Sequence, residues 1–214
     1  LDAPHEYWID EAKHTLYFYP PVPLEQWTEG VYISQNLTAA NVTADHITLR
    51  NIGIRHSRGT GVVGMNVTGL RVENCEISGH GQHGVAIVGN QSGVDSSRVY
   101  SVGCSGVRVS GGVARTLTAG KSFATGNNIS DFALHKRTYN PGVFWNGIGN
   151  NYSYNTVTNS PHVCFLGGGN EGVPWGQAPK SGDGSDCLFE GNTLDTCVTE
   201  CGDILLREFQ SLAC

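Results

Sequence analysis

His162 and Asp203 are the residues of this sequence best suited to move a proton, and each precedes a short apolar run. An imidazole beside a carboxylate can act as an acid, a base or a nucleophile. Hydrolysis of a glycosidic bond ordinarily uses two carboxyl groups, about 5 to 5.5 Å apart when the configuration is retained and about 6.5 to 9.5 Å apart when it is inverted. Glu200, in the turn before Asp203, is our candidate for the second carboxyl group.

A second set of side chains could hold a ligand. The segment 134–141 contains the only cationic cluster of the sequence, and it could bind the carboxylates or sulfates of an acidic glycan or be a solvated loop. The two histidines in GHGQHG, His80 and His83, could face the same ligand, and a tryptophan in the Gly- and Pro-rich segment 167–186 could be a sugar platform or a cover for the core. The candidate ligand-binding residues are His83, His135, Lys136, Arg137, Tyr139, Trp175 and Arg207.

The seven cysteines match no complete metal motif. Cys197 and Cys201 could supply two zinc ligands, but no second close pair of cysteines or histidines follows at the spacing of a zinc finger. Asp183 and Asp186 lack the remaining ligands of a calcium loop. We therefore predict no metal and no cofactor. Because the count is odd, at least one thiol is free or paired outside the chain, and both buried free thiols and a disulfide remain open.

Composition and charge limit the partners. The 214 residues carry 13 Lys and Arg against 19 Asp and Glu, a formal charge of −6 at pH 7. Phosphate binding needs clustered cations, so we predict no nucleic-acid partner. No apolar run approaches the ~20 residues of a membrane-spanning helix. Sequons favour a secreted glycoprotein, although many Asn, Ser and Thr also produce them by chance. The sequon asparagines are Asn36, Asn41, Asn66, Asn90, Asn128 and Asn151.

An internal repeat indicates how the candidate residues are positioned. The segment 47–62 matches 70–85 at a separation of 23 residues, and a third copy follows after 22. Looser copies at 127–131, 155–159 and 192–196 are separated by 28 and then 37 residues. Alternating apolar residues between Gly, Asn and Ser predict strands of about three to five residues, and helical spacing is not sustained. Repeats of this length without helices indicate a parallel β-solenoid, in which equivalent residues of successive rungs stack about 4.7 to 4.9 Å apart.

Stacked rungs predict columns of equivalent residues. Columns of Ile, Val, Leu and Cys would form the core, and Asn51 and Asn74 would bond each other at a turn. Alignment of each rung on its apolar strand places His162 and Asp203 near 5 Å apart, in one polar column. The predicted members of that column are Thr60, His83, Ser105, His162 and Asp203.

Residues 1–44 differ from the rest of the chain because they are rich in aromatic residues and proline and show no repeat. We predict an N-terminal lead-in or capping segment at 1–44 and a β-helix at 45–214. The aromatic residues around Trp8 and Tyr17 alternate as in a hairpin, with residues 11–14 as its turn.

Three segments, 111–120, 138–171 and 189–206, resemble in this order the right-handed parallel β-helix proteins of the pectate-lyase-like superfamily, in the branch that includes β-helix glycoside hydrolases. The resemblance covers nearly the whole chain and implies an all-β, right-handed parallel β-helix of about six rungs. Asp203 matches the Asp of a family motif, Asp-Ala-Gly-Ala-hydrophobic-Tyr, and is the catalytic candidate by that analogy. This chain departs from the motif with Ile-Leu-Leu-Arg after Asp203, and Glu171 replaces the Asp of a Gly-Asn-Asp motif.

The resemblance implies a secreted, carbohydrate-active protein that hydrolyses a polysaccharide, with Asp203 as acid or nucleophile and His162 assisting. A non-catalytic glycan-binding or structural module is the alternative, favoured by the departures after Asp203. In a third hypothesis, a polysaccharide lyase, Lys136 or Arg137 would abstract a proton, and the lack of acidic calcium ligands counts against it. Family helices continue further, so we expect 45–214 to be incomplete at its C-terminal end, where an uncapped rung could self-associate.

Overall fold

The structure, a computed structural model, describes residues 1–28, 32–168 and 185–197. The chain divides into two compact units, Leu1–Ile33 and Ser34–Cys214. The first unit holds an antiparallel hairpin of β1 (Tyr7–Asp10) and β2 (Thr15–Phe18), followed by a 3-10 turn, η1 (Leu24–Gln26). The hairpin confirms the prediction from the aromatic pattern, and Trp8 stacks on its cross-strand partner Tyr17 with ring centroids 5.3 Å apart.

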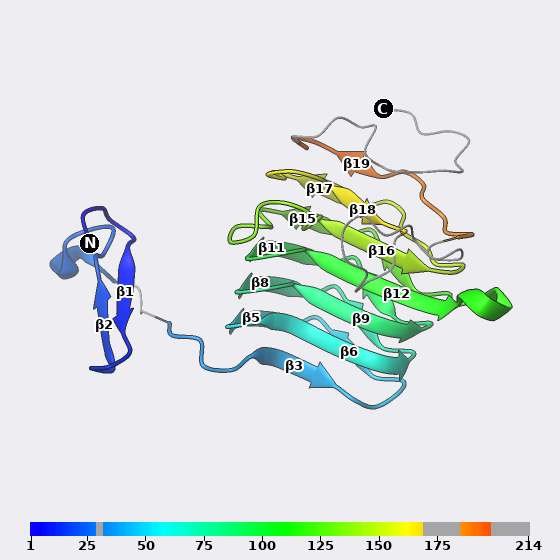
Figure 1. Cartoon of the computed structure of the whole chain (residues 1–214), viewed down its shortest axis with the longest axis horizontal. Helices are drawn as coiled ribbons and strands as arrows, with labels where there is room; N and C mark the ends of the chain where they lie inside the picture. The colour runs from blue at the N-terminus through cyan, green and yellow to red at the C-terminus, as the bar shows by residue number, and fades with distance from the viewer. Residues whose placement is uncertain (29–31, 169–184, 198–214) are drawn as a thin grey trace. The chain divides into compact units, whose positions relative to one another are not determined.

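The second unit is a coil of short strands that form three parallel sheets (Figure 1). Sheet 1 contains β3 (Thr38–Val42), β6 (Thr60–Thr68), β9 (Val85–Asn90), β12 (Val107–Val113), β16 (Val143–Gly147) and β18 (Phe165–Gly167). Sheet 2 contains β4 (Thr48–Arg50), β7 (Arg71–Glu73), β10 (Gly93–Asp95) and β14 (Phe123–Thr125). Sheet 3 contains β5 (Gly53–Ser57), β8 (Glu76–His80), β11 (Arg98–Val102), β15 (Asn128–Ser130), β17 (Thr156–Thr158) and β19 (Thr193–Leu194).

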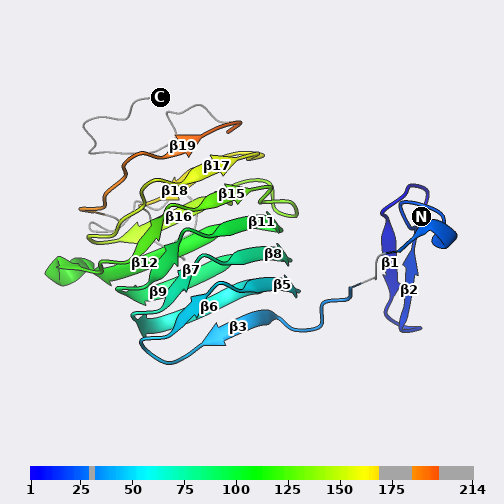
Figure 2. The ribbon, with the colours of Figure 1, turned by 180° about the vertical axis from the view of Figure 1, so that it is seen from behind.

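The chain runs from sheet 1 through sheet 2 to sheet 3 and returns to sheet 1 one strand further along. Among the described residues, sheet 2 has strands in the first four coils, and isolated bridges at Asn151 and Leu188 continue its line. Figures 1 and 2 show these coils stacked from β3 to β19. The one antiparallel addition in the described part of this unit is β13 (Thr118–Ala119), which follows a 3-10 turn, η2 (Ala114–Thr116), and pairs with the end of β12. The predicted all-β, right-handed parallel β-helix is confirmed, and the described strands of sheet 1 give the predicted six rungs. The first strand of the helix, β3, lies within the segment 1–44 that we predicted as the lead-in, and it pairs in parallel with β6.

Inward-facing apolar side chains form continuous columns, as predicted. Strand residues alternate between the two faces of a sheet, so every second residue of each strand points into the coil. Each fully buried Val or Ile contributes about 1.5 to 3 kcal/mol of transfer free energy. The column of sheet 1 is Val62, Val85, Val107, Val143 and Phe165, and that of sheet 3 is Ile54, Ile77, Val99, Ile129 and Val157.

The corner between sheet 2 and sheet 3 repeats from coil to coil. One residue of each corner adopts a positive φ, which Asn and Gly tolerate best. Asn51 (φ 59°) and Asn74 (φ 50°) occupy this position in the first two coils, and Asn74 Nδ2 donates to Asn51 Oδ1 at 2.7 Å. The predicted stacking of these two asparagines is therefore confirmed. The later coils use Ser96, Gly126, Tyr154 and Gly191.

One disulfide joins Cys164, just before β18, to Cys197, which follows β19, with the two Cα atoms 5.7 Å apart. Cys75, Cys104 and Cys187 are free thiols, and Cys201 and Cys214 lie outside the described residues. The C-terminal end of the helix and its predicted self-association lie outside them as well. Within the described ranges no helix has the length and apolar character to cross a membrane.

Candidate functional site

The predicted ligand-binding residues that the structure describes lie where the chain enters sheet 1. His83 precedes β9, the loop 131–142 lies between β15 and β16, and His162 precedes β18. Because the strands of sheet 1 are parallel, their first residues lie along one edge of the sheet, which we call the leading edge. Four predicted site residues lie outside the described part of the chain: Trp175, Glu200, Asp203 and Arg207.

The loop 131–142 is held against the preceding coils by its backbone. The backbone N–H groups of His135 and Lys136 both donate to the Gly103 carbonyl, at 2.9 and 3.0 Å. The side chain of buried Asn140 donates to the carbonyls of Lys136 and Thr138 within the loop. The side chains of His135, Lys136, Arg137 and Tyr139 are exposed, so a fixed backbone presents them to solvent.

His83 has an unusual electrostatic setting at the leading edge. Its Nδ1 accepts a hydrogen bond from the backbone N–H of Ser105 at 3.2 Å, which leaves the proton of the neutral ring on Nε2. Burial, together with the positive charges of Arg108 and Lys136, lowers the pKa of His83 to about 4. The ring is therefore neutral near pH 7 and can act as a hydrogen-bond donor toward a ligand.

Arg108 is a candidate site residue that the sequence analysis missed. It lies on the outer face of β12, where its guanidinium stands 4.1 Å above the ring centroid of Phe144 on the neighbouring strand β16. Burial lowers the pKa of Arg108, which still keeps its proton at any ordinary pH. A shallow groove of about 40 Å³ runs beside this pair, between Met65, Val88, Ser110 and Phe144.

The signal for Arg108 was present in the alternation of β12. Val107 and Val109 are buried, so Arg108 and Ser110 must face outward. Strand pairing places Arg108 in an outer column with small or apolar neighbours on the flanking strands: Asn41, Val63, Ala86, Phe144 and Leu166. A single cation in such a column is conspicuous once the strands are aligned. The sequence repeat was too irregular between 108 and 143 to align β12 with β16.

Tyr139 and His162 come together at the leading edge. Their ring centroids lie 4.9 Å apart in an edge-to-face arrangement. This contact brings the cationic loop beside the predicted catalytic histidine.

The predicted polar column is correct for Thr60, His83 and Ser105 but wrong at His162. Phe165 pairs with Val143, so the residue level with His83 and Ser105 is Val163, which is buried. His162 lies one residue earlier. A shift of one residue turns a side chain to the other face of a strand, and the apolar run 163–165 gave no sign of which register applied.

Cys104 lies within reach of the same two cations as His83. Burial raises the pKa of its thiol, and the positive charges of Lys136 and Arg108 act in the opposite direction. The same two cations thus act on both His83 and Cys104.

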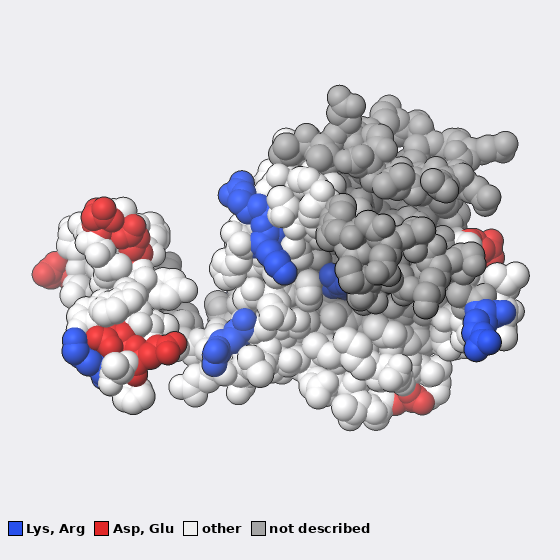
Figure 3. Space-filling view, viewed as in Figure 1, with Lys and Arg blue, Asp and Glu red and all other residues white. Residues whose placement is uncertain are grey.

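Figure 3 shows Lys and Arg side chains on this side of the helix, beside the loop 131–142, whereas Asp and Glu appear only at other margins of its described surface.

The described residues contain no cluster of three or more His, Cys, Asp or Glu side chains that could hold a metal ion.

His80, the other candidate histidine for the ligand-binding face, is structural. Its Nδ1 lies 2.8 Å from Ser57 Oγ and its Nε2 lies 3.0 Å from the Ile54 carbonyl oxygen, all in the interior. The leading edge therefore offers cations, aromatic rings and a neutral imidazole, a chemistry suited to binding carboxylates.

Comparison with known proteins identifies one similar solved structure and no relative by sequence. No protein-family model and no curated protein matches the chain. The A-module of the mannuronan C-5 epimerase AlgE4 from Azotobacter vinelandii is similar in structure, with a TM-score of 0.40 and 13% sequence identity. The match covers 76% of this chain and 54% of that one, so this chain spans about half of that module. The parallel β-helix of this chain is established by its own strand pairing.

Proposed function

We propose that this protein binds an acidic polysaccharide across the outer face of sheet 1 and hydrolyses it. The observation that carries the proposal is the convergence of Lys136, Arg108 and His83 with the rings of Tyr139 and Phe144 at the leading edge. These five residues come from four segments of the chain, and their chemistry is that of a site for carboxylate-bearing sugars.

The geometry of a β-helix suits a linear polymer. Successive coils repeat about every 4.8 Å, so equivalent side chains form a row of regularly spaced contacts comparable with the spacing of sugar units. Arg108 presents a planar guanidinium that matches a carboxylate in two hydrogen bonds, and Lys136 presents a mobile point charge. Because Arg108 is held over Phe144, less conformational freedom is lost when a ligand binds.

For the reaction itself, we propose Asp203 as the acid or nucleophile, with Glu200 as the second carboxyl group and His162 assisting. In hydrolysis, a carboxylic acid protonates the glycosidic oxygen while a second carboxylate attacks the sugar or activates water. This assignment comes from the sequence, since both acids lie outside the described residues. Tyr139, packed on His162, would position that ring at the leading edge.

We also propose that the protein is secreted. The Cys164–Cys197 disulfide is typical of an oxidising compartment. Asn36, Asn41, Asn66, Asn90 and Asn128 are exposed, as glycosylation would require. Recovery of the natural protein from culture medium, with a mass that falls on glycosidase treatment, is the expected result; recovery only from a reduced cytosolic fraction would overturn this proposal.

The binding step is tested with polygalacturonate, alginate and a neutral glucan as probes, using titration calorimetry at two salt concentrations. Arg108→Ala is expected to weaken binding of an acidic polymer about tenfold, since hydrogen bonds to charged groups contribute about 1.5 to 3 kcal/mol. Arg98→Ala is the matched control, because Arg98 also stacks on an aromatic ring, Tyr100, at 4.3 Å, but lies on sheet 3. It is expected to bind like the wild type.

The reaction is tested by following new reducing ends and the absorbance of unsaturated uronates in the same samples, with Asp203→Asn as control. Reducing ends without the chromophore, lost in Asp203→Asn, are expected for a hydrolase. Appearance of the unsaturated-uronate absorbance would show that the enzyme cleaves by elimination and is a lyase. Binding without any product would show a non-catalytic glycan-binding module. Equal affinity for the neutral glucan, or no effect of Arg108→Ala, would overturn the proposed acidic-glycan site.

A further inference from the structure

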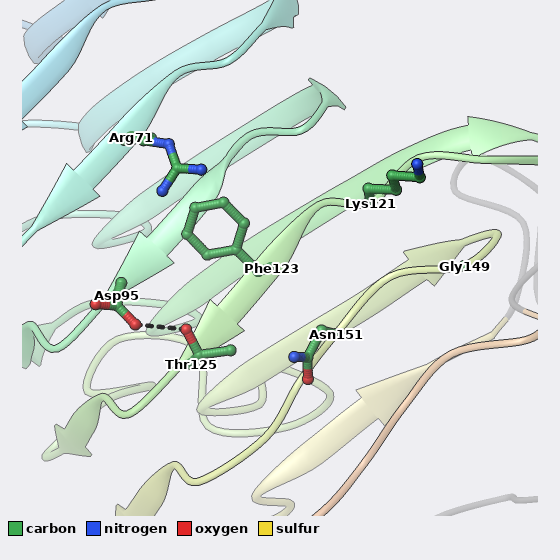
Figure 4. A pocket seen from close by; sticks show the side chains of 7 residues that line it. All are labelled: Arg71, Asp95, Lys121, Phe123, Thr125, Gly149 and Asn151. Carbon is green, nitrogen blue, oxygen red and sulfur yellow. Dashed lines mark hydrogen bonds between the residues drawn. The ribbon is translucent and has the colours of Figure 1, made fainter.

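An open hollow of about 520 Å³ lies on the outer face of sheet 2, which is a different face of the helix from the leading edge. Strands β7, β10 and β14, Lys121 just before β14, and the segment 149–151 supply its lining. Figure 4 shows the Phe123 ring at its centre with Arg71 on one side. Its volume falls in the range of about 300 to 1,000 Å³ that small-molecule sites occupy. The lining residues are Arg71, Asp95, Lys121, Phe123, Thr125, Gly149 and Asn151.

The hollow exists because one column of sheet 2 is interrupted by glycine. Strand pairing aligns Arg71, Gly93, Phe123 and Asn151 across four successive coils. Gly93 has no side chain, and a Cβ there would lie 1.8 Å from the carbonyl oxygen of Phe123. The guanidinium of Arg71 therefore reaches across the glycine and lies 5.2 Å from the centroid of the Phe123 ring.

The hollow carries one cation that is available to an anionic ligand. Arg71 is already paired with Glu73 at 3.3 Å, and Glu73 also accepts from Arg50. Lys121 is exposed and has no ion-pair partner within the described ranges of the chain. A carboxylate near Lys121 would therefore gain an attraction that no acidic side chain of the described residues already supplies.

The opposite side of the hollow is suited to hydroxyl groups. Asp95 accepts from Thr125 Oγ1 at 2.6 Å and from Ser96 Oγ at 2.9 Å, which fixes the carboxylate and leaves some of its roughly four acceptor positions open. Asn151 Oδ1 accepts from Ser153 Oγ at 2.5 Å, which leaves the Nδ2 group on the other side of the amide to donate to a different partner. An acceptor and a donor thus flank the Phe123 ring.

We propose that this hollow binds a single uronic-acid residue of a saccharide. The carboxylate of the sugar would contact Lys121, its hydroxyl groups would contact Asp95 and Asn151, and the C–H face of the ring would pack on Phe123. Phosphate or sulfate alone is disfavoured because Asp95 would repel it, whereas a uronic acid separates its charge from its hydroxyl groups. The site is independent of catalysis at sheet 1 and of the residues of the leading edge.

The test uses the ¹⁵N-labelled chain and follows backbone amide shifts during titration with methyl glucuronide, methyl glucoside and sodium acetate. Methyl glucuronide is expected to shift the amides of Thr125, Gly149 and Asn151 with millimolar affinity. Lys121→Gln is expected to raise the dissociation constant about fivefold, in line with an exposed ion pair. Phe123→Leu, which keeps an apolar side chain, is expected to raise it about tenfold.

Lys136→Gln is the matched control, because it removes a lysine of the leading edge and should leave these shifts unchanged. Equal shifts with methyl glucoside would overturn the role of the carboxylate, and equal shifts with acetate would reduce the hollow to a simple anion site. No shift at saturating glucuronide, in protein with a wild-type circular dichroism spectrum, would overturn the site altogether. If Lys136→Gln abolished polymer binding while the hollow still bound glucuronide, the two sites would be separate.

Discussion

His83 illustrates how the surroundings of one residue of the leading edge affect stability. In the folded chain its pKa is about 4, because of burial and of the cations Arg108 and Lys136, against an ordinary value of about 6.5. Between these two pH values the unfolded chain binds a proton that the folded chain does not. Stability therefore falls as the pH drops from about 6.5 to about 4, and the contribution of this group is constant above and below that window.

The prediction is that His83→Gln flattens this dependence. Urea unfolding measured at half-unit steps from pH 7.5 to 4 should show a smaller loss of unfolding free energy for the variant than for the wild type. His80, whose pKa burial also lowers, acts in the same direction and stays in both proteins. If the unfolding free energy of wild type and variant fell equally with pH below 6.5, folded His83 would take up its proton over the same pH range as unfolded His83, which would contradict the lowered pKa.

At the residue scale the sequence predicted the composition of the site better than its geometry. The cationic segment 134–141 and His83 were recognisable from residue type, and the structure places them along one edge. Arg108 and Phe144 were missed because each looks ordinary alone, and only strand pairing brings them together. Residue type is visible in a sequence, whereas contact between coils depends on register, which the long insertion before β16 concealed.

At the scale of the elements, an internal ladder of polar side chains stabilises the corner before sheet 3. Buried Asn127 accepts from the backbone N–H of Ser97 at 3.0 Å, and its Nδ2 donates to the Val94 carbonyl and to Asn155 Oδ1. Asn155 makes the equivalent bonds to the next coil through Asn192. The asparagine of one coil thereby forms hydrogen bonds with buried backbone groups of the neighbouring coil, and buried polar groups need such partners.

Asn127→Ala is expected to destabilise the protein by about 3 kcal/mol, because it leaves buried partners of Asn127 unsatisfied. Asn128→Ala is the matched control, since Asn128 is the next residue, begins β15 and is exposed, and it should change stability by less than about 0.5 kcal/mol. The measurement is the free energy of unfolding in urea. Similar losses for both variants would mean that the ladder adds nothing beyond the strand itself.

The ladder also shows what repeat analysis could and could not predict. The stacked pair Asn51 and Asn74 was predicted because the two lie at identical positions in a repeat of 23 residues. The segments that contain Asn127, Asn155 and Asn192 were also aligned from the sequence, at separations of 28 and 37 residues, and strand pairing confirms that alignment. The hydrogen-bonded ladder itself was not predicted, because the burial of Asn127 and Asn155 does not follow from the alignment alone. The one-residue error at His162 arose instead at the apolar run 163–165, which is too short and too uniform to fix its own register.

At the scale of the whole molecule, the helix is a stack in which each coil contacts its neighbours, so stability depends on how the coils are joined and how the ends are filled. The last described coils are filled by aromatic rings, with Phe189 lying 5.1 Å from Trp145 and 5.3 Å from Tyr152 between ring centroids. The parallel solenoid could be predicted from the sequence because it follows from periodicity, which local composition preserves, and the family resemblance added the number of rungs. This aromatic filling could not, since its members lie far apart in the sequence.

The Cys164–Cys197 disulfide spans these same coils and should be a main contributor to their stability. It closes a loop with a sequence separation of 33 residues, for which chain entropy predicts a stabilisation of about 3 to 4 kcal/mol. The double variant Cys164→Ala/Cys197→Ala is expected to lose about that amount in urea unfolding without reductant, whereas Cys104→Ala, which removes a free thiol, should lose much less. Peptide mapping without reduction should recover the Cys164–Cys197 pair. Alkylation of Cys164 in the unreduced, unfolded protein would contradict the pairing, and equal stability of the double variant would show that coil packing alone holds this end of the helix.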